Sequence, residues 1–295
     1  MKNGKTFGEL LTRREFLKRT SLGLIGAGLV YAGLDTRSLL AALKGGQATK
    51  KGKMFFRKLG KTGISISEIS FNGGVLKDLS VLSYAMDMGL NFIDTAPAYG
   101  DGKSEMLIGK LLKYRPKDLI VATKWKVNEQ YRVKEYEESV NASLKNLNVD
   151  TIDIIQAWAV MRKSQVNHEP MFEAFEKLKQ AGKVRYLGIT THRNEVEVSG
   201  EIVRNGRYDT MTVAYNYKNY EQMTPIIEQA SKKGMGIIGQ FITEGVYNLP
   251  NPFSKTKKGA VEWALQNTDL DSVIVDLRNI QEVDELLRIP EQLRK

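Results

Sequence analysis

The stretch at residues 91–105 places an acid, Asp94, five residues before a phenol, Tyr99. A short apolar run ending at Ile93 predicts a buried strand, and a proline and two glycines after Asp94 predict a loop. A helical pattern begins at Lys103. In a parallel sheet, this is the edge where active sites are assembled. The pair therefore stands where acid–base chemistry would be done.

A lysine, Lys124, follows the next predicted strand, Leu119–Thr123. A nearby ammonium favours phenolate, so we expect Lys124 to lower the pKa of Tyr99 from about 10, while Asp94 holds the lysine in place. Such a tyrosine can give a proton to a carbonyl oxygen, or take one from an alcohol, near neutral pH. The three residues lack a reductant, which a nicotinamide cofactor would supply.

Composition excludes several other chemistries. The 295 residues include no cysteine, which rules out disulfides, a thiol nucleophile, cysteine-ligated zinc and iron–sulfur clusters. With only two histidines, His168 and His192, we predict no histidine-based metal site. His168 is predicted to begin a helix and His192 to lie in a loop.

The net charge of +10 is concentrated at the N-terminus. Residues 1–53 hold eleven Lys and Arg against three acids, which leaves the remainder close to neutral. A nucleic-acid-binding domain usually carries a broad basic surface. We therefore expect no nucleic-acid partner.

Paired arginines, Arg13 and Arg14, precede an apolar run from Leu22 to Leu34 that is too short to span a bilayer comfortably. A charged segment before a short apolar one is typical of a signal peptide. With Phe16, Leu17 and Lys18 behind the arginines, this segment resembles a twin-arginine export signal. The alternative is an ordinary basic amphipathic segment.

The resemblance implies recognition by the twin-arginine export machinery and a location in the periplasm or cell envelope. We predict a signal peptide at residues 1–42, a flexible linker at 43–53 and a single folded domain at 54–295. Two outcomes stay open for the signal peptide: cleavage near Leu40-Ala41-Ala42, or retention as an anchor.

From Met54 onward, short apolar strands alternate with amphipathic helices after a hairpin of Phe55–Leu59 and Ile64–Ser67. The predicted strands are Glu68–Phe71, Asn91–Ile93, Leu119–Thr123, Ile152–Ala157, Arg185–Ile189, Thr210–Ala214, Gly236–Gln240 and Ser272–Val275. The predicted helices are Asp78–Met88, Lys103–Tyr114, Val133–Asn146, Glu169–Gln180, Glu195–Arg204, Glu221–Lys232, Lys258–Gln266 and Gln281–Leu287. Eight alternations predict a (β/α)8 TIM barrel with an N-terminal β-hairpin. A doubly wound open sheet is second, because no G-x-G-x-x-G turn opens a helix.

Two segments, NFIDTAPAYGDGKSEMLIGK and IVATKW, resemble the signature segments of the aldo-keto reductases, which are nicotinamide-dependent (β/α)8 barrels. The likeness runs from about Phe55 to Glu285. It implies that Tyr99 is the general acid/base, that Lys124 tunes it and that Asp94 orients Lys124. Trp158 stands where the family has its catalytic histidine. An indole N–H can donate a hydrogen bond but cannot shuttle protons, so Trp158 would position a substrate oxygen.

The same resemblance implies a cofactor site for NADP, with NAD also possible. An acid, Asp276, replaces the glycine of the phosphate-binding segment and would repel a phosphate unless the loop turns it away. Arg278 could meet a 2′-phosphate bidentately. The implied cofactor-binding residues are Thr190, Thr191, Thr212, Arg278, Asn279 and Glu285.

Two functions remain open from the sequence. The first is an NADP(H)-dependent enzyme that interconverts a carbonyl and an alcohol. The second is a degenerate barrel that binds a ligand or a partner without hydride transfer, which the departures at Thr190, Thr191, Thr212 and Asp276 favour. The sequence favours the enzyme. It identifies neither the substrate, nor the direction of reaction, nor the oligomeric state.

Overall fold

The computed structural model describes residues 48–51, 54–115 and 119–295. The predicted export signal and the boundary at residue 42 lie outside them. Thr49–Lys51, predicted as part of a flexible linker, form a strand, β1, that pairs antiparallel with β2 (Met54–Lys58). Within the described ranges, no helix is long and apolar enough to cross a bilayer.

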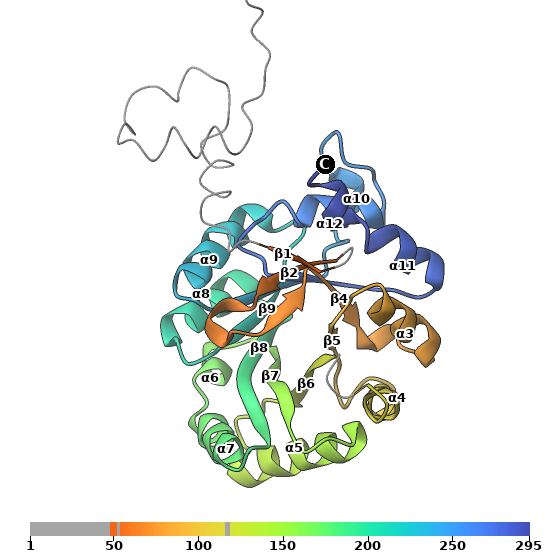
Figure 1. Ribbon diagram of the computed structural model, residues 1–295. Coiled ribbons are helices and arrows are strands. Elements are labelled where there is room, and N and C mark those ends of the chain that lie inside the picture. Colours follow the sequence, from red (N-terminus) through yellow and green to blue (C-terminus); the bar gives the residue numbers. More distant parts are fainter. Residues whose placement is uncertain (1–47, 52–53, 116–118) are drawn as a thin grey trace, which may run out of the picture. The chain divides into compact units, whose positions relative to one another are not determined.

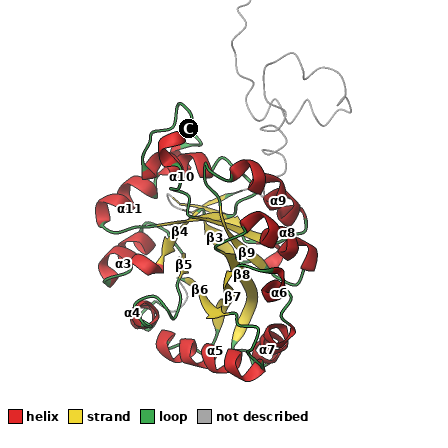
Figure 2. Ribbon diagram, turned by 180° about the vertical axis from the view of Figure 1, so that it is seen from behind, coloured by secondary structure: helices red, strands yellow, loops and turns green. Residues whose placement is uncertain are grey.

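Eight parallel strands close into a barrel, and helices surround them (Figures 1 and 2). The strands are β4 (Ile69–Asn72), β5 (Phe92–Asp94), β6 (Ile120–Lys126), β7 (Ile152–Val160), β8 (Val184–Thr191), β9 (Thr210–Ala214), β10 (Gly236–Gln240) and β11 (Ser272–Val275). The α-helices are α3 (Leu79–Asp87), α4 (Lys103–Leu112), α5 (Val133–Leu147), α6 (Lys163–Val166), α7 (Glu169–Gln180), α8 (Glu195–Asn205), α9 (Tyr220–Lys232), α10 (Lys257–Ala264), α11 (Ile280–Leu286) and α12 (Ile289–Gln292). The predicted (β/α)8 barrel is confirmed, and so is the hairpin, formed by β2 and β3 (Ser65–Ser67).

Most element boundaries differ from the prediction by one or two residues, and capping explains some of the differences. The helix predicted to begin at Asp78 begins at Leu79, because the Asp78 carboxylate caps it by accepting from the Ser80 N–H (2.8 Å). In the same way, Thr256 caps α10. The short helices α6 and α12 were not predicted from the sequence.

Strands β6 and β7 run further than predicted, because each is paired with the other up to Lys126 and Trp158. The pairing of β7 with β8 is irregular between Ala157 and Val160, and Ala159 has a φ of 53°. A left-handed alanine costs free energy and changes the direction of the strand. The chain is thus deflected directly after Trp158.

The inside of the barrel is filled by alternate residues of the strands, as the two-residue period of a strand requires. Its apolar cluster consists of Leu59, Ile64, Ile66, Phe92, Ala122, Ile154, Ile238 and Ile274. The intervening residues, such as Ile93 and Ile155, face the larger core between strands and helices. Three members of the inner cluster come from the hairpin segment, which therefore closes the N-terminal end.

The turn of this hairpin fits closely against the barrel. A Cβ added to Gly60 (φ 48°) would lie 2.3 Å from the Gly236 backbone nitrogen, so only glycine fits there. The Gly60 N–H and the Ile237 N–H both donate to the Asp271 carboxylate, at 3.2 and 2.9 Å. The Tyr186 hydroxyl donates to the Thr62 carbonyl (2.7 Å). The N-terminal end is thereby sealed, which leaves the carboxyl ends of the strands to form a site.

The buried carboxyl of Asp271 should make the stability of the protein depend on pH. Burial raises the pKa of this carboxyl to about 7, against the opposing effect of its two backbone hydrogen bonds. Between the ordinary pKa and about 7, the unfolded chain releases this proton and the folded chain keeps it. Relative to an Asp271→Asn variant, the wild-type free energy of unfolding should therefore fall as pH rises from 4 to 7, by at most about 4 kcal/mol.

Urea unfolding between pH 4 and pH 8 measures this difference. The matched control is Asp101→Asn, at an exposed position where the left-handed backbone suits asparagine. A difference between wild type and Asp271→Asn that stays constant across this pH range would contradict the assignment.

Candidate active site

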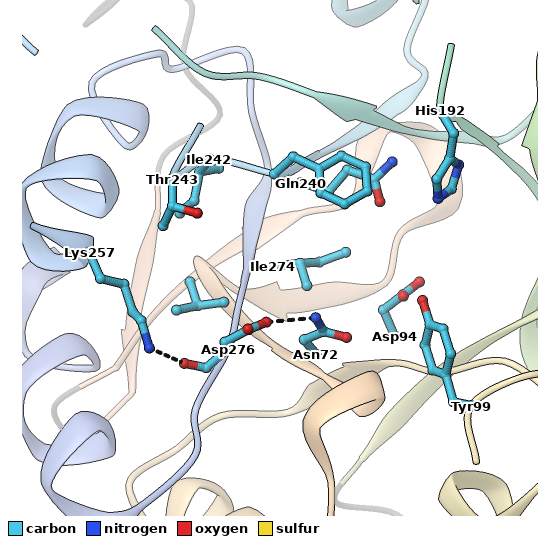
Figure 3. A pocket seen from close by; sticks show the side chains of 12 residues that line it. Asn72, Asp94, Tyr99, His192, Gln240, Ile242, Thr243, Lys257, Ile274 and Asp276 are labelled. Carbon is cyan, nitrogen blue, oxygen red and sulfur yellow. Dashed lines mark hydrogen bonds between the residues drawn. The ribbon is translucent and has the colours of Figure 1, made fainter. Parts of the chain in front are cut away.

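A cavity of about 260 Å³ lies at the carboxyl ends of the strands (Figure 3). Its walls are Asn72, Asp94, Tyr99, His192, Gln240, Phe241, Ile242, Thr243, Lys257, Ile274, Val275 and Asp276. These residues come from β4, β5, β10 and β11 and from the segments that follow β5, β8, β10 and β11, with Lys257 at the start of α10. The volume lies slightly below the range of about 300–1,000 Å³ that is usual for ligand pockets.

Lys124 and Asp94 form a buried ion pair beneath this cavity. The Lys124 ammonium lies 2.5 Å from Asp94 Oδ2, and the side chains are only 1% and 4% exposed. The same ammonium donates to the Thr95 carbonyl (2.8 Å) and to the Tyr99 hydroxyl (3.4 Å). It also lies 4.8 Å from the centroid of the Tyr99 ring. The three residues singled out in the sequence are thus in direct contact.

A glutamine completes the surroundings of Asp94. Gln156 Nε2 donates to Asp94 Oδ1 (2.7 Å), and Gln156 Oε1 accepts from the Thr212 hydroxyl (2.8 Å). Both oxygens of the carboxylate therefore accept a charge-assisted hydrogen bond, which fixes its orientation. The result is a continuous chain of contacts from Tyr99 through Lys124, Asp94 and Gln156 to Thr212, crossing four strands.

The predicted direction of the Tyr99 pKa shift was wrong. Burial raises the pKa of the phenol above its ordinary value of 10, and the nearby Asp94 carboxylate adds to the increase. The Lys124 ammonium opposes both, as expected, but its effect is smaller than that of burial. In this structure Tyr99 is therefore a protonated donor at neutral pH, held beside a cation that would stabilise its phenolate.

His192 follows β8, as its prediction as a loop residue implied, but it also lines the cavity. Its ring meets the Phe241 ring edge to face, with centroids 5.4 Å apart. Burial and the Lys124 ammonium lower the pKa of the imidazole below its usual 6.5, against opposing effects of Asp94 and Glu195. It is therefore neutral at pH 7.

The tryptophans lie elsewhere. Trp158, predicted to take the position of a catalytic histidine, is half-buried and does not line the cavity. Trp125 is 1% exposed and packs edge to face against Tyr136 of α5, which makes it a core residue.

The three threonines of the predicted cofactor site are fully buried. The Thr190 hydroxyl accepts from the Ala159 N–H (3.0 Å), and the Thr212 hydroxyl is bound to Gln156. The Thr191 carbonyl accepts from Gln240 Nε2 (3.0 Å), while its hydroxyl has no partner among the described residues. None of the three lines the cavity.

At the end of β11, Asp276 lines the cavity and is neutralised within the protein. Its carboxylate accepts from Asn72 Nδ2 (2.7 Å) and from the exposed Arg278 guanidinium (2.6 Å). Lys257 is likewise engaged, with Glu282 Oε1 (2.7 Å) and the Asp276 carbonyl (3.0 Å). Cations are therefore present at this edge, but each already has an anionic partner.

The other predicted cofactor residues lie beyond the cavity wall. The Asn279 side chain caps α11 by accepting from the Glu282 N–H (2.9 Å). Glu285 is exposed on α11. Within the described part of the chain, no cluster of three or more His, Asp or Glu side chains could hold a metal ion.

Four residues of the site were not among the site residues predicted from the sequence, namely Asn72, Gln156, Gln240 and Lys257. A signal was present for the first three, which end or interrupt apolar strands with an amide. Inspection of the last inward-facing residue of every strand would have found Asn72 and Gln240. Lys257 belongs to a basic run at a helix start, and that pattern is more often a solvated surface.

Comparison with known proteins gives a consistent picture. A family model described as "Aldo/keto reductase family" matches residues 76–246, more than half of the chain. L-galactose dehydrogenase of Arabidopsis thaliana is 27% identical over 280 residues, which cover 79% of this chain and 87% of that protein. The aldo-keto reductase YhdN of Bacillus subtilis is 35% identical over 158 residues, or 46% of this chain and 47% of that one.

Solved structures support the fold. A putative aldo-keto reductase from Pseudomonas aeruginosa superposes with a TM-score of 0.69 at 22% identity, covering 81% of this chain and 95% of that one. An aldo-keto reductase from Bacillus halodurans, in its holo form, gives a TM-score of 0.68 at 22% identity, with 81% and 91% coverage.

Because Lys124 and Asp94 form a buried ion pair, we expect a large coupling energy between them in a double-mutant cycle of unfolding free energies. Lys124→Met leaves an uncompensated buried carboxylate, so the free energy of unfolding should fall by about 3–5 kcal/mol. Adding Asp94→Asn removes that charge, so the double variant should be more stable than Lys124→Met alone. Urea unfolding of the wild type, both single variants and the double variant gives the cycle. Strictly additive losses would mean that the two side chains do not interact.

Proposed function

The chain belongs to the aldo/keto reductase family, whose members are oxidoreductases, and on that premise we propose that it interconverts a carbonyl and an alcohol with NADP(H). One observation carries the proposal. The Tyr99 hydroxyl stands on the wall of the cavity, 3.4 Å from a lysine that a buried carboxylate fixes in place.

A nicotinamide cofactor, when bound, would supply the hydride for the carbonyl carbon or accept one from the alcohol carbon. Tyr99 supplies the proton that the carbonyl oxygen needs. Its raised pKa keeps the proton in place until negative charge develops on that oxygen. The phenolate left behind lies beside the Lys124 ammonium, which stabilises it. In the oxidative direction the phenolate takes the alcohol proton back.

Asp94 and Gln156 act as positioning residues in this account. Lys124 has a long flexible side chain, and its ammonium is useful only at one place relative to Tyr99. Asp94 and the Thr95 carbonyl fix that place, and Gln156 fixes Asp94. Catalysis of this kind depends on charges that are already oriented before the reaction.

The cavity leaves room for the nicotinamide end of the cofactor, whereas at the phosphate end the cations are already paired with carboxylates. The cavity would hold the nicotinamide ring beside Tyr99, and the residues implied for the remainder of the dinucleotide are Arg278, Asn279 and Glu285, in the segment after β11 and on α11. There, binding a 2′-phosphate would require Arg278 to exchange Asp276 for the phosphate. Asn279 caps α11 and Glu285 lies on it, so both follow Arg278 closely in the chain.

Of the predicted nicotinamide contacts, only the Thr191 hydroxyl is without a protein partner among the described residues, but Thr191 is fully buried and does not line the cavity. The hydroxyls of Thr190 and Thr212 support the site through Ala159 and Gln156 instead. NADP is favoured over NAD by Arg278 and by the relative from Schizosaccharomyces pombe named "Aldo-keto reductase yakc [NADP(+)]", which is 30% identical over 122 residues.

Tyr99→Phe tests the function. The ring and its packing remain, so NADPH should still bind, as followed by quenching of tryptophan fluorescence. Oxidation of NADPH by an aldehyde, followed at 340 nm, should fall by about 10²–10⁴-fold because the proton donor is gone. If the wild-type protein does not bind NADPH or NADH, or if Tyr99→Phe turns over at the wild-type rate, the proposal fails.

Export to the periplasm or cell envelope is a separate proposal, supported by Arg13, Arg14 and the apolar run behind them. Twin-arginine export moves folded proteins, which suits an enzyme that acquires its cofactor beforehand. Arg13→Lys/Arg14→Lys should retain the protein in the cytoplasm of a bacterial host, as measured by cell fractionation against the unchanged signal. Equal export of the two forms would contradict the proposal.

A further inference from the structure

We propose that His192, from the segment after β8, donates the hydrogen bond that orients the substrate's carbonyl oxygen toward Tyr99. The inference rests on the proposed function and extends it. The resemblance to the aldo-keto reductases implies that Trp158, near the end of β7, orients the substrate oxygen. The structure moves this role to the next strand of the barrel.

The first reason is position. His192 lies on the wall of the same cavity as Tyr99 and Asp94. Figure 3 shows its ring projecting from the end of β8 toward the side of the cavity where the Tyr99 hydroxyl and the Asp94 carboxylate lie. The imidazole is also close enough to Lys124 and Asp94 for both charges to act on it. A carbonyl oxygen placed at the Tyr99 hydroxyl would therefore lie between the phenol and the imidazole.

The second reason is that the imidazole is available. Its Nδ1 is buried and has no hydrogen-bond partner among the described residues. Three other polar side chains on the wall are engaged: Asn72 donates to Asp276, Gln240 to the Thr191 carbonyl and Lys257 to Glu282. A buried polar atom without a partner destabilises the protein. Because Nδ1 has no acceptor beside it, the tautomer with the proton on Nε2 is favoured, and Nε2 is the ring nitrogen that a substrate in the cavity would meet.

The third reason is how the ring is held. Phe241 packs against it edge to face, and Phe241 itself has a φ of 53°. A left-handed phenylalanine is strained, and such strain is concentrated at functional sites. Phe241 is also 43% exposed, so core packing does not account for its conformation. The strained backbone places its ring against His192 and limits the directions in which the imidazole can point.

The protonation state suits the role. The groups that act on His192 are the Lys124 ammonium, the Asp94 and Glu195 carboxylates and the surrounding burial. Burial and Lys124 outweigh the carboxylates, so the pKa of the imidazole lies below 6.5 and the ring is neutral at pH 7. A neutral imidazole has one N–H to donate and does not compete with Tyr99 for proton transfer.

The experiment compares three variants in the full chain: His192→Ala, His192→Gln and His168→Gln. Glutamine keeps an N–H donor at position 192. His168 is the matched control, because its ring contacts the Tyr131 carbonyl (3.1 Å) away from the cavity. Each variant is first checked for NADPH binding. Values of kcat and KM are then measured with 4-nitrobenzaldehyde and NADPH, alongside the wild type and Tyr99→Phe.

We expect His192→Ala to lower kcat/KM by about 10²-fold, the usual loss for one donor to a developing oxyanion. His192→Gln should recover part of the loss and His168→Gln should match the wild type. NADPH binding should be unchanged in all three. Trp158→Phe, which removes the indole N–H, should lose less than His192→Ala.

A second readout does not need turnover. The chain has two histidines, so the His168→Gln variant assigns the imidazole Cε1–H signal of His192 in a proton spectrum. That signal should titrate with a midpoint below 6.5. In the complex with NADP⁺, which cannot reduce the aldehyde, adding 4-nitrobenzaldehyde should shift it. The signal of His168 in wild type should stay in place.

The inference is overturned if His192→Ala keeps a kcat/KM within threefold of wild type, if His192→Gln is no better than His192→Ala, or if the aldehyde leaves the His192 signal unmoved. Failure of the proposed function is distinguishable from these outcomes. If the wild type itself does not oxidise NADPH, the function fails and this inference fails with it. If the wild type reduces the aldehyde and Tyr99→Phe does not, the function stands and the His192 variants decide.

Discussion

A single buried ion pair, Lys124 with Asp94, is what the site depends on. Neither charge is stable in the interior of a barrel without the other, because desolvation costs several kcal/mol for each ion. The pair is retained only where its remaining hydrogen-bonding capacity is used, and here Thr95, Gln156 and Tyr99 use it. The Tyr99 hydroxyl is thus held in place because it accepts one of the hydrogen bonds that the buried Lys124 ammonium must donate.

The barrel makes this pair possible by dividing its interior into two layers. The inward-facing residues near the N-terminal ends are apolar, and the hairpin seals them with Leu59, Ile64 and Ile66. Two residues further along β5, β6 and β7, the inward-facing residues become Asp94, Lys124 and Gln156. The period of a strand therefore places catalytic groups directly above a rigid apolar floor, which holds them still.

The sequence was sufficient for the parts of the account that depend on local pattern. Alternating segments predicted the barrel, and strand ends predicted the contact of Asp94, Tyr99 and Lys124. The sequence was not sufficient to predict the surroundings of a side chain where these are formed by segments far apart in the chain. The sign of the Tyr99 pKa shift depends on how deeply the fold buries the ring. The position of His192 on the wall depends on how the ends of β8 and β10 meet.

The phosphate end of the site shows the same limit. Asp276 predicted repulsion of a phosphate, but the structure joins it to Asn72 and Arg278, residues that are 204 and 2 positions away. The long-range partner could not be read from local sequence. The negative charge of Asp276 is therefore neutralised by Arg278. If Arg278 bound a cofactor phosphate instead, Asp276 would lose that partner and its charge would face the cofactor.

The central claim is that Tyr99 is a protonated donor whose phenolate Lys124 would stabilise. The most direct measurement is the titration of Tyr99, followed by nuclear magnetic resonance of a ¹³C label at its ring Cζ and assigned with Tyr99→Phe. The account predicts that the phenol remains protonated up to pH 10 in the cofactor-free protein, and that Lys124→Met raises its midpoint further. Ionisation of Tyr99 below pH 10, or the same titration midpoint in wild type and Lys124→Met, would contradict the account.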